Sequence, residues 1–230
     1  NAASYLAVLL ALLALRLPPG TTTTGGSIVD ELREGLAFAW REPGVRAALG
    51  AVSVTSALGL SYSTLLPVLA RDVLGGGVQG YGLLLAGAGI GAITGALASA
   101  SRRGTAGTGT VISLAQGARG AALVALGSTR SLAVATGVMV LVGLAVALQL
   151  ATTNGFLQVI APPRLRGRLV SLYIWLFVGM SPLGGLAAGW LAERVGAPRT
   201  AWVAGVACLA SAVVTLSAMA RRRPDSPGAR

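Results

Sequence analysis

Six apolar stretches of about 20 residues or more make up most of this sequence, and short segments with nearly all of its charges separate them. The stretches cover residues 46–69, 81–100, 107–126, 132–160, 169–192 and 200–220. A helix needs about 20 apolar residues to cross the hydrocarbon core of a bilayer. Charged residues make up 11% of the chain, whereas an average soluble protein has about 25%. The sequence therefore predicts an all-α membrane protein built as a bundle of six transmembrane helices.

Residues 161–173 (APPRLRGRLVSLY) form the sharpest interruption between two apolar stretches, with two prolines and the arginines Arg164, Arg166 and Arg168. Proline and unpartnered arginine are both unfavourable in hydrocarbon, so we predict a tight turn at a membrane surface. Two roles are open for this arginine cluster. It either anchors the turn beside anionic lipid, or pairs with acids elsewhere in the protein in one conformation.

The distribution of arginine predicts which loops are cytoplasmic. Six alternating spans divide the loops into two sets, one with thirteen arginines and one with four, while Arg119 lies inside a span. Cytoplasmic loops of membrane proteins carry an excess of Lys and Arg, so the first set, which includes the turn at 161–173, is predicted to be cytoplasmic. We therefore expect a multi-pass protein of the cell membrane (inner or plasma membrane) with a cytoplasmic C-terminus.

Four segments follow from these spans. We predict the end of a preceding transmembrane helix, a cytoplasmic linker, the six-helix bundle and a cytoplasmic tail at residues 1–16, 17–45, 46–220 and 221–230. Within the linker, Ile28, Leu32, Leu36 and Trp40 recur every four residues, which predicts an amphipathic helix. This helix lies on the membrane surface or against the spans; a plain linker helix explains the pattern equally well.

The residue types exclude several classes of site. The chain has no histidine, and its single cysteine, Cys208, lies in an apolar stretch. We expect no catalytic site, no metal site and no cofactor, because no histidine is available for catalysis or for metal binding. The single cysteine cannot form an internal disulfide. The net charge of +11 does not predict nucleic-acid binding, which needs a basic face on a soluble domain. Two non-transport readings stay open: a membrane scaffold or assembly subunit, and a membrane-embedded enzyme.

Several motifs resemble those of the major facilitator superfamily of transporters. They are PPRLRGR at residues 162–168, SLY at 171–173, SPLG at 181–184 and LLPVLA at 65–70, together with Asn154 and Gln158. The combination is most similar to the enterobactin-exporter-like branch, whose members export drugs and siderophores. The segment 99–104 (SASRRG) keeps the arginines of a superfamily loop signature but lacks its acid.

This resemblance implies a fold, partners and a function. The chain would be the C-terminal half of a twelve-helix transporter, and its partners would be the lipid bilayer, a missing N-terminal six-helix half and a small-molecule substrate. The expected function is efflux of small lipophilic or amphipathic molecules by alternating access. No Asp or Glu lies in the middle of a span, so if transport is coupled to protons, the titrating carboxylate is expected in the missing half.

In such a transporter the six apolar stretches would be the seventh to twelfth helices. The resemblance places the seventh and tenth helices, here the stretches 46–69 and 132–160, on the substrate cavity, with the eighth and eleventh beside them. Polar residues in the seventh and tenth helices are the cavity candidates: Ser61, Tyr62, Thr64, Gln149, Thr153, Asn154 and Gln158. Polar groups within hydrocarbon need partners, so these side chains bond either neighbouring helices or the substrate and water. Residues that bend or weaken a helix are the gating or hinge candidates: Pro67, Gly179, Pro182 and Gly184.

Two further features have open roles. Gly87, Gly91 and Gly95 are four residues apart, so one stripe of this helix lacks side chains and predicts close helix packing, or alternatively a smooth substrate path. Arg119 is the only charge in the middle of a span. An intramembrane arginine is a functional candidate by default, but pairing within the bundle explains it as well.

Overall fold

The computed structural model describes residues 28–59, 62–102, 104 and 106–220, together with a few residues between 6 and 13. The described elements are α2 (Ile28–Arg41), α3 (Pro43–Val54), η1 (Thr55–Gly59), α4 (Tyr62–Val68), η2 (Leu69–Val73), α5 (Gly77–Ala100), α6 (Thr108–Ser128), α7 (Leu132–Ile160), η3 (Pro163–Leu165), α8 (Arg166–Val195) and α9 (Ala197–Ala220). Within this part of the chain every element is helical and six helices are long and apolar enough to cross a membrane. The predicted all-α six-helix bundle is confirmed. The predictions for residues 1–16, for Ser61 and for the tail at 221–230 lie largely or wholly outside the described residues.

The helices extend beyond the apolar stretches at several ends. The second begins at Gly77 rather than near residue 81, and α8 runs from Arg166 to Val195 rather than over 169–192. Most of the additional residues are polar, small or charged. A hydropathy pattern detects only the part that suits hydrocarbon, whereas backbone hydrogen bonding continues the helix outside it.

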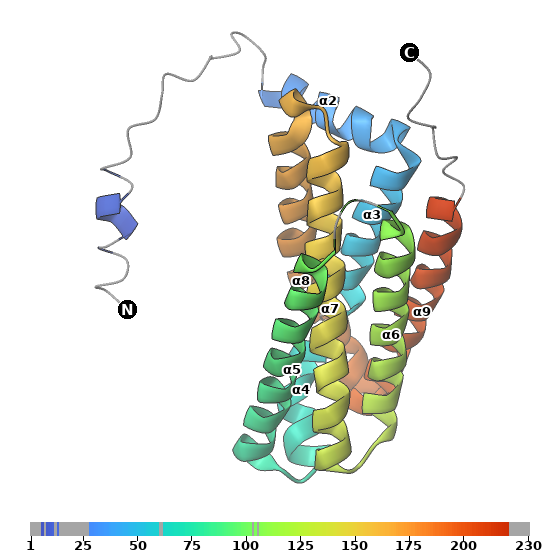
Figure 1. The fold of residues 1–230 in the computed structure, drawn as a ribbon. Coiled ribbons are helices and arrows are strands. Elements are labelled where there is room, and N and C mark those ends of the chain that lie inside the picture. The colour runs from blue at the N-terminus through green and yellow to red at the C-terminus, as the bar shows by residue number, and fades with distance from the viewer. Residues whose placement is uncertain are drawn as a thin grey trace.

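Helix α2 lies across one end of the bundle, almost at right angles to the long helices (Figure 1). It ends at Arg41, and Pro43 starts α3 in the first helical turn, where its missing N–H is not needed. The Glu34 carboxylate accepts a hydrogen bond from Arg168 and lies 2.9 Å from Arg164, so α2 is held to η3 and to the start of α8. Leu36 and Trp40 are exposed, and the apolar face predicted for this helix therefore points away from the spans at these two positions.

The first span is interrupted twice. Helix α3 passes into the π-helical segment η1 at Thr55, and α4 passes into a second π-helical segment, η2, at Leu69. Pro67 lies inside α4, two residues before η2. A π-helical turn widens the backbone and leaves the normal i to i−4 ladder. The first span therefore departs from regular α-helical geometry at two places, η1 and η2.

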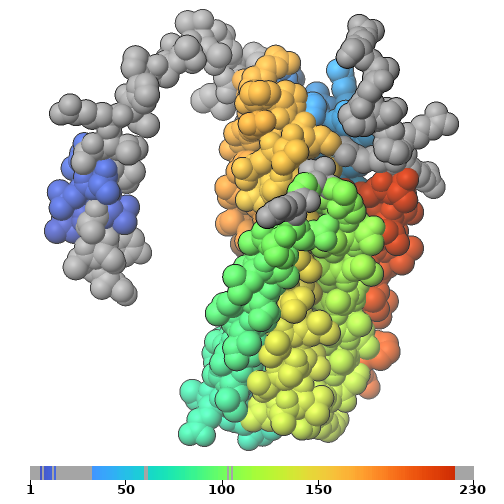
Figure 2. Space-filling model, viewed as in Figure 1, coloured from blue at the N-terminus to red at the C-terminus, as the bar shows by residue number. Residues whose placement is uncertain are grey.

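Glycines set the two closest helix pairs. On α5, a Cβ added to Gly87, Gly91 or Gly95 would lie 2.7, 1.9 or 2.3 Å from a backbone oxygen of α7. On α6 and α9, Gly120 and Gly205 meet face to face, and a Cβ on either would lie within 2.7 Å of the other's carbonyl oxygen. Such small-residue contacts let membrane helices pack backbone to backbone. Helices α5, α6 and α7 form adjacent columns on one face of the molecule (Figure 2).

The side chains on the outside of the bundle are largely apolar. Exposed apolar residues include Ile90, Ile93, Leu186 and Val213. In water this surface would be a large hydrophobic patch, but in a membrane it meets lipid at no cost. The chain is a multi-pass membrane protein embedded in a lipid bilayer.

Candidate functional site

Arg119 lies at the centre of the bundle. It occupies the middle of α6, and its side chain is 0% exposed. Its Nη1 donates to Gln149 Oε1 on α7 at 3.0 Å, and its Nη2 donates to Thr55 Oγ1 at the start of η1 at 2.8 Å. A weaker contact of 3.8 Å joins Nη2 to Cys208 Sγ on α9. We call Thr55, Arg119, Gln149 and Cys208 the Arg119 cluster; it connects four helices.

Thr55 and Gln149 complete the cluster by bonding each other. Gln149 Nε2 donates to Thr55 Oγ1 at 2.7 Å and to the Ala51 carbonyl at 3.3 Å. The Thr55 hydroxyl in turn donates to the Ala51 carbonyl at 2.7 Å. The Thr55 hydroxyl therefore uses its single donor and both acceptor sites. The arrangement fixes the backbone of α3 just before it enters the π-helical segment.

The partners of Arg119 in this structure are neutral. Among the described residues, the guanidinium bonds an amide, a hydroxyl and a thiol, and its Nε has no hydrogen-bond partner. Ion pairs among the described residues lie at the ends of the bundle, where Arg71 meets Asp72 and where Glu34 meets Arg164 of η3 and Arg168 of α8. A buried charge is normally paired with a charge of opposite sign. Arg119 is thus a positive charge in the membrane interior without a carboxylate neighbour in the described residues.

The π-helical segment η1 is packed on both sides. Gly59 lies directly against the guanidinium, because a Cβ there would be 2.7 Å from Arg119 Cζ. On the other side, Gly184 of α8 lies so close to Ala57 that a Cβ added to this glycine would be 1.9 Å from the Ala57 carbonyl oxygen. The Ser56 hydroxyl donates a hydrogen bond to the Phe177 carbonyl of α8. The interrupted helix is therefore held between α8 and the Arg119 cluster.

A second buried polar group joins α6 to α9. Gln116 Nε2 donates to Ser211 Oγ at 2.8 Å, and Thr215 Oγ1 donates to Gln116 Oε1 at 3.3 Å. These bonds are between two adjacent helices only.

The structure separates the cavity candidates on α7 into two sets. Gln149 and Thr153 are 0% exposed and face the bundle interior. Asn154 and Gln158 lie on a different face, where Gln158 Nε2 donates to Asn154 Oδ1 at 3.0 Å and Gln158 is exposed. On the first span, Tyr62 is 9% exposed and Thr64 is exposed beside Gly185. Ser61 lies outside the described residues.

The hinge candidates are also in different environments. Pro182 lies inside the continuous helix α8, and Gly184 forms the contact with Ala57 described above. Gly179 is exposed, with the Trp175 side chain nearby. Pro67 lines a pocket of about 300 Å³. Sequence reasoning did not predict the break at η1, because none of its residues is a proline.

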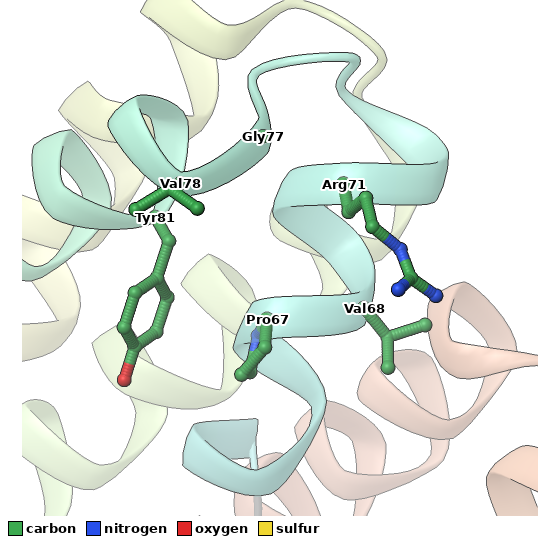
Figure 3. A pocket seen from close by; sticks show the side chains of 6 residues that line it. All are labelled: Pro67, Val68, Arg71, Gly77, Val78 and Tyr81. Carbon is green, nitrogen blue, oxygen red and sulfur yellow. The ribbon is translucent and has the colours of Figure 1, made fainter.

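This pocket lies between the end of the first span and the start of α5. Its lining includes Pro67, Val68, Val78 and Tyr81, with Arg71 at the rim pointing away from Tyr81 (Figure 3). Arg71 donates to both carboxylate oxygens of Asp72, at 2.7 and 3.2 Å. Because this guanidinium is already paired, the pocket offers mainly apolar surface.

A second hollow of about 220 Å³ lies near the other end of α5 and α7. Its polar lining includes Ser99, Arg102 and Thr152. Ser99 Oγ and Thr152 Oγ1 are 3.3 Å apart and share a hydrogen bond, while Arg102 Nη2 donates to the Ala106 carbonyl at 3.0 Å. The bonds within the hollow tie α5 to α7 and close the loop before α6.

Comparison with known proteins gives one result. Residues 1–226 match the model of a family described as transmembrane secretion effector, a family of major facilitator type. No curated protein and no solved structure matches the chain.

Proposed function

Because the chain belongs to the transmembrane secretion effector family of major facilitator transporters, we propose that it exports small lipophilic or amphipathic molecules. It works by alternating access as the C-terminal half of a twelve-helix transporter, with an N-terminal six-helix half as its partner. The observation that carries this proposal is the interrupted first span. π-helical turns within α-helices often occur at functional sites, and η1 is such a turn in the first span, bonded through Thr55 to Arg119.

The cavity face, in this proposal, is formed by the first span and α7. Tyr62, Thr64, Asn154 and Gln158 contact substrate and water. Gln149 and Thr153 support that face from inside, because their side chains are fully buried. Amides that bond each other, as Asn154 and Gln158 do, can exchange that bond for one to a ligand at small net cost.

The moving parts are the two halves of the first span and the adjacent α8. Pro67 removes a backbone donor inside α4, and Pro182 does the same inside α8. Gly184 fixes the contact between these helices at Ala57. We propose that the span bends at η1 and near Pro67 while Gly179, Pro182 and Gly184 let α8 follow it.

The end of the bundle that carries α2 is proposed to be cytoplasmic, as is the C-terminus. Arg164 of η3, Arg166 and Arg168 at the start of α8 and the arginines of α2 gather there, which agrees with the excess of positive charge on cytoplasmic loops. The membrane is accordingly proposed to be the cell membrane, with Arg164, Arg166 and Arg168 at its inner surface.

Efflux of a lipophilic dye tests the proposed function. Cells that express the full-length protein should accumulate less N-phenyl-1-naphthylamine than cells without it, and an uncoupler should restore accumulation if a proton gradient drives export. Equal accumulation in both strains would contradict export and favour a scaffold. Cysteines placed at Asn154 and Gln158 of the full-length protein should react with polar thiol reagents; complete protection would place these residues away from the cavity.

A further inference from the structure

We propose that Arg119 gives the substrate pathway a positive electrostatic potential and so favours substrates with a negative charge. This inference rests on the proposed function and adds the chemical class of the substrate. The class is an amphipathic organic anion, such as an aromatic carboxylate or sulfonate. Arg119 acts through its field, since its side chain is not exposed.

The first step is the excess charge of the Arg119 cluster. A guanidinium has five N–H donors and is always protonated in proteins. Its three polar contacts go to neutral atoms on Thr55, Gln149 and Cys208, and Nε has no hydrogen-bond partner among the described residues. Hydrogen bonds to neutral groups stabilise the charge but do not cancel it. The field of Arg119 therefore reaches beyond the cluster.

The second step is the position of the charge behind the interrupted helix. The guanidinium lies against Gly59, at the end of η1, where no side chain separates it from the backbone. Tyr62, a residue of the proposed cavity face, follows Gly59 by three positions in the chain. Three residues of helix rise about 4.5 Å, so a substrate held beside Tyr62 is about 10 Å from the charge.

The third step is the size of the effect. Between two unit charges about 10 Å apart, at an effective dielectric constant of about 20, the interaction changes affinity roughly tenfold. In the described part of the chain, the acidic groups that would oppose the field of Arg119 lie at the ends of the bundle. Asp72 is bonded to Arg71 beyond the end of α4, and Glu193 lies in the last turn of α8 beside Arg194. Glu34 is bonded to Arg164 and Arg168 next to α2.

The experiment uses two probes that differ by one charged group. Both 8-anilinonaphthalene-1-sulfonate and N-phenyl-1-naphthylamine contain the same anilinonaphthalene skeleton, but only the first carries a sulfonate. Export of each is measured in inside-out membrane vesicles that contain the full-length protein. We expect the wild-type protein to have a kcat/KM for the sulfonate at least severalfold above that for the neutral probe. A preference for the neutral probe would overturn the inference and leave the proposed function standing. Export of neither probe would count against both.

Three variants separate the charge from its structural role. Arg119→Gln should lower the sulfonate-to-neutral ratio of kcat/KM about tenfold, whereas Arg119→Lys should retain most of the ratio because it keeps the charge. Gln116→Leu, a change to a buried polar residue on the same helix, should leave the ratio unchanged.

Protein level and thermal unfolding in detergent are recorded for each variant. An unchanged ratio in a folded Arg119→Gln protein, or an equal loss for both probes, would overturn the inference. If Arg119→Gln does not fold, the wild-type preference and the Arg119→Lys ratio decide.

Discussion

Arg119 and Thr55 are 64 residues apart in the chain, and their side chains form a 2.8 Å hydrogen bond at the centre of the bundle. The same hydroxyl accepts a bond from Gln149 on a third helix. The relationship explains how a charged residue is tolerated in the middle of a span. It also fixes the point at which the first span leaves regular α-helical geometry.

Replacing Thr55 by valine tests the role of this hydroxyl. Thr55→Val keeps the shape of the side chain but removes the hydroxyl, which accepts hydrogen bonds from Arg119 and Gln149 and donates one to the Ala51 carbonyl. Leaving a buried donor without its partner costs about 1–3 kcal/mol, so we expect a clear fall in the thermal unfolding temperature of the protein in detergent. Ser53→Ala is the control, because the Ser53 hydroxyl bonds only the Leu49 carbonyl of its own helix. An equal effect of both substitutions would contradict a special role for Thr55.

The contact between α8 and η1 predicts a difference between two glycines of one helix. Gly184→Ala places a Cβ 1.9 Å from the Ala57 oxygen, whereas Gly189→Ala meets nothing within 4 Å. Overpacking of this kind costs about 1–3 kcal/mol, and more where backbone must move. We expect Gly184→Ala to lower the unfolding temperature and Gly189→Ala to leave it unchanged or slightly raised. Similar unfolding temperatures for the two variants would show that α8 does not pack here as described.

The pair of α5 and α7 gives an independent test of glycine packing. Gly91→Ala brings a Cβ to 1.9 Å from the Val140 oxygen, while Gly89→Ala, on the outer side of the same helix, meets nothing within 4 Å. Gly91→Ala should reduce the amount of folded protein in the membrane, and Gly89→Ala should not. Fluorescence-detected gel filtration of tagged protein measures both. A normal, monodisperse peak for Gly91→Ala would contradict the close approach of these helices.

The ion pairs of Glu34 should hold α2 in place with little effect on overall stability. Exposed ion pairs contribute about 0–1 kcal/mol, so Glu34→Gln should change the global unfolding temperature only slightly. Hydrogen exchange of α2 should nevertheless become faster, because the bonds to Arg164 and Arg168 are lost. Glu193→Gln, at the far end of α8, is the matched control. Unchanged exchange in α2 after Glu34→Gln would mean that apolar contacts alone hold this helix.

Labelling of single cysteines tests the proposed orientation. Gly167 at the start of α8 and Arg130 between α6 and α7 are both exposed, at opposite ends of the bundle. In a Cys208→Ala background, Arg130→Cys should react with a membrane-impermeant maleimide in intact cells, and Gly167→Cys should react only after the membrane is opened. The reverse pattern would place the end that carries α2 outside the cell.

The sequence by itself determined the number of spans, their approximate limits and the clustering of arginine at one end. These follow from local chemistry, because a helix in lipid must be apolar over a fixed length and must satisfy its own backbone hydrogen bonds. The stripe of Gly87, Gly91 and Gly95 could also be recognised, because glycines four residues apart lie on one face of a helix.

Only the tertiary structure decided what each polar side chain meets. The periodicity of an almost uniformly apolar helix does not fix its rotation about its own axis, so the sequence left Arg119 without a partner and treated Gln149 and Asn154 as equivalent candidates. The structure buries Gln149 against Thr55 and leaves Asn154 bonded to Gln158. It also interrupts the first span at Thr55, where contacts from three other helices favour the π-helical turn, rather than at Pro67 alone. Local sequence cannot encode such a break, because the groups that stabilise it lie tens of residues away and come together only when the helices pack.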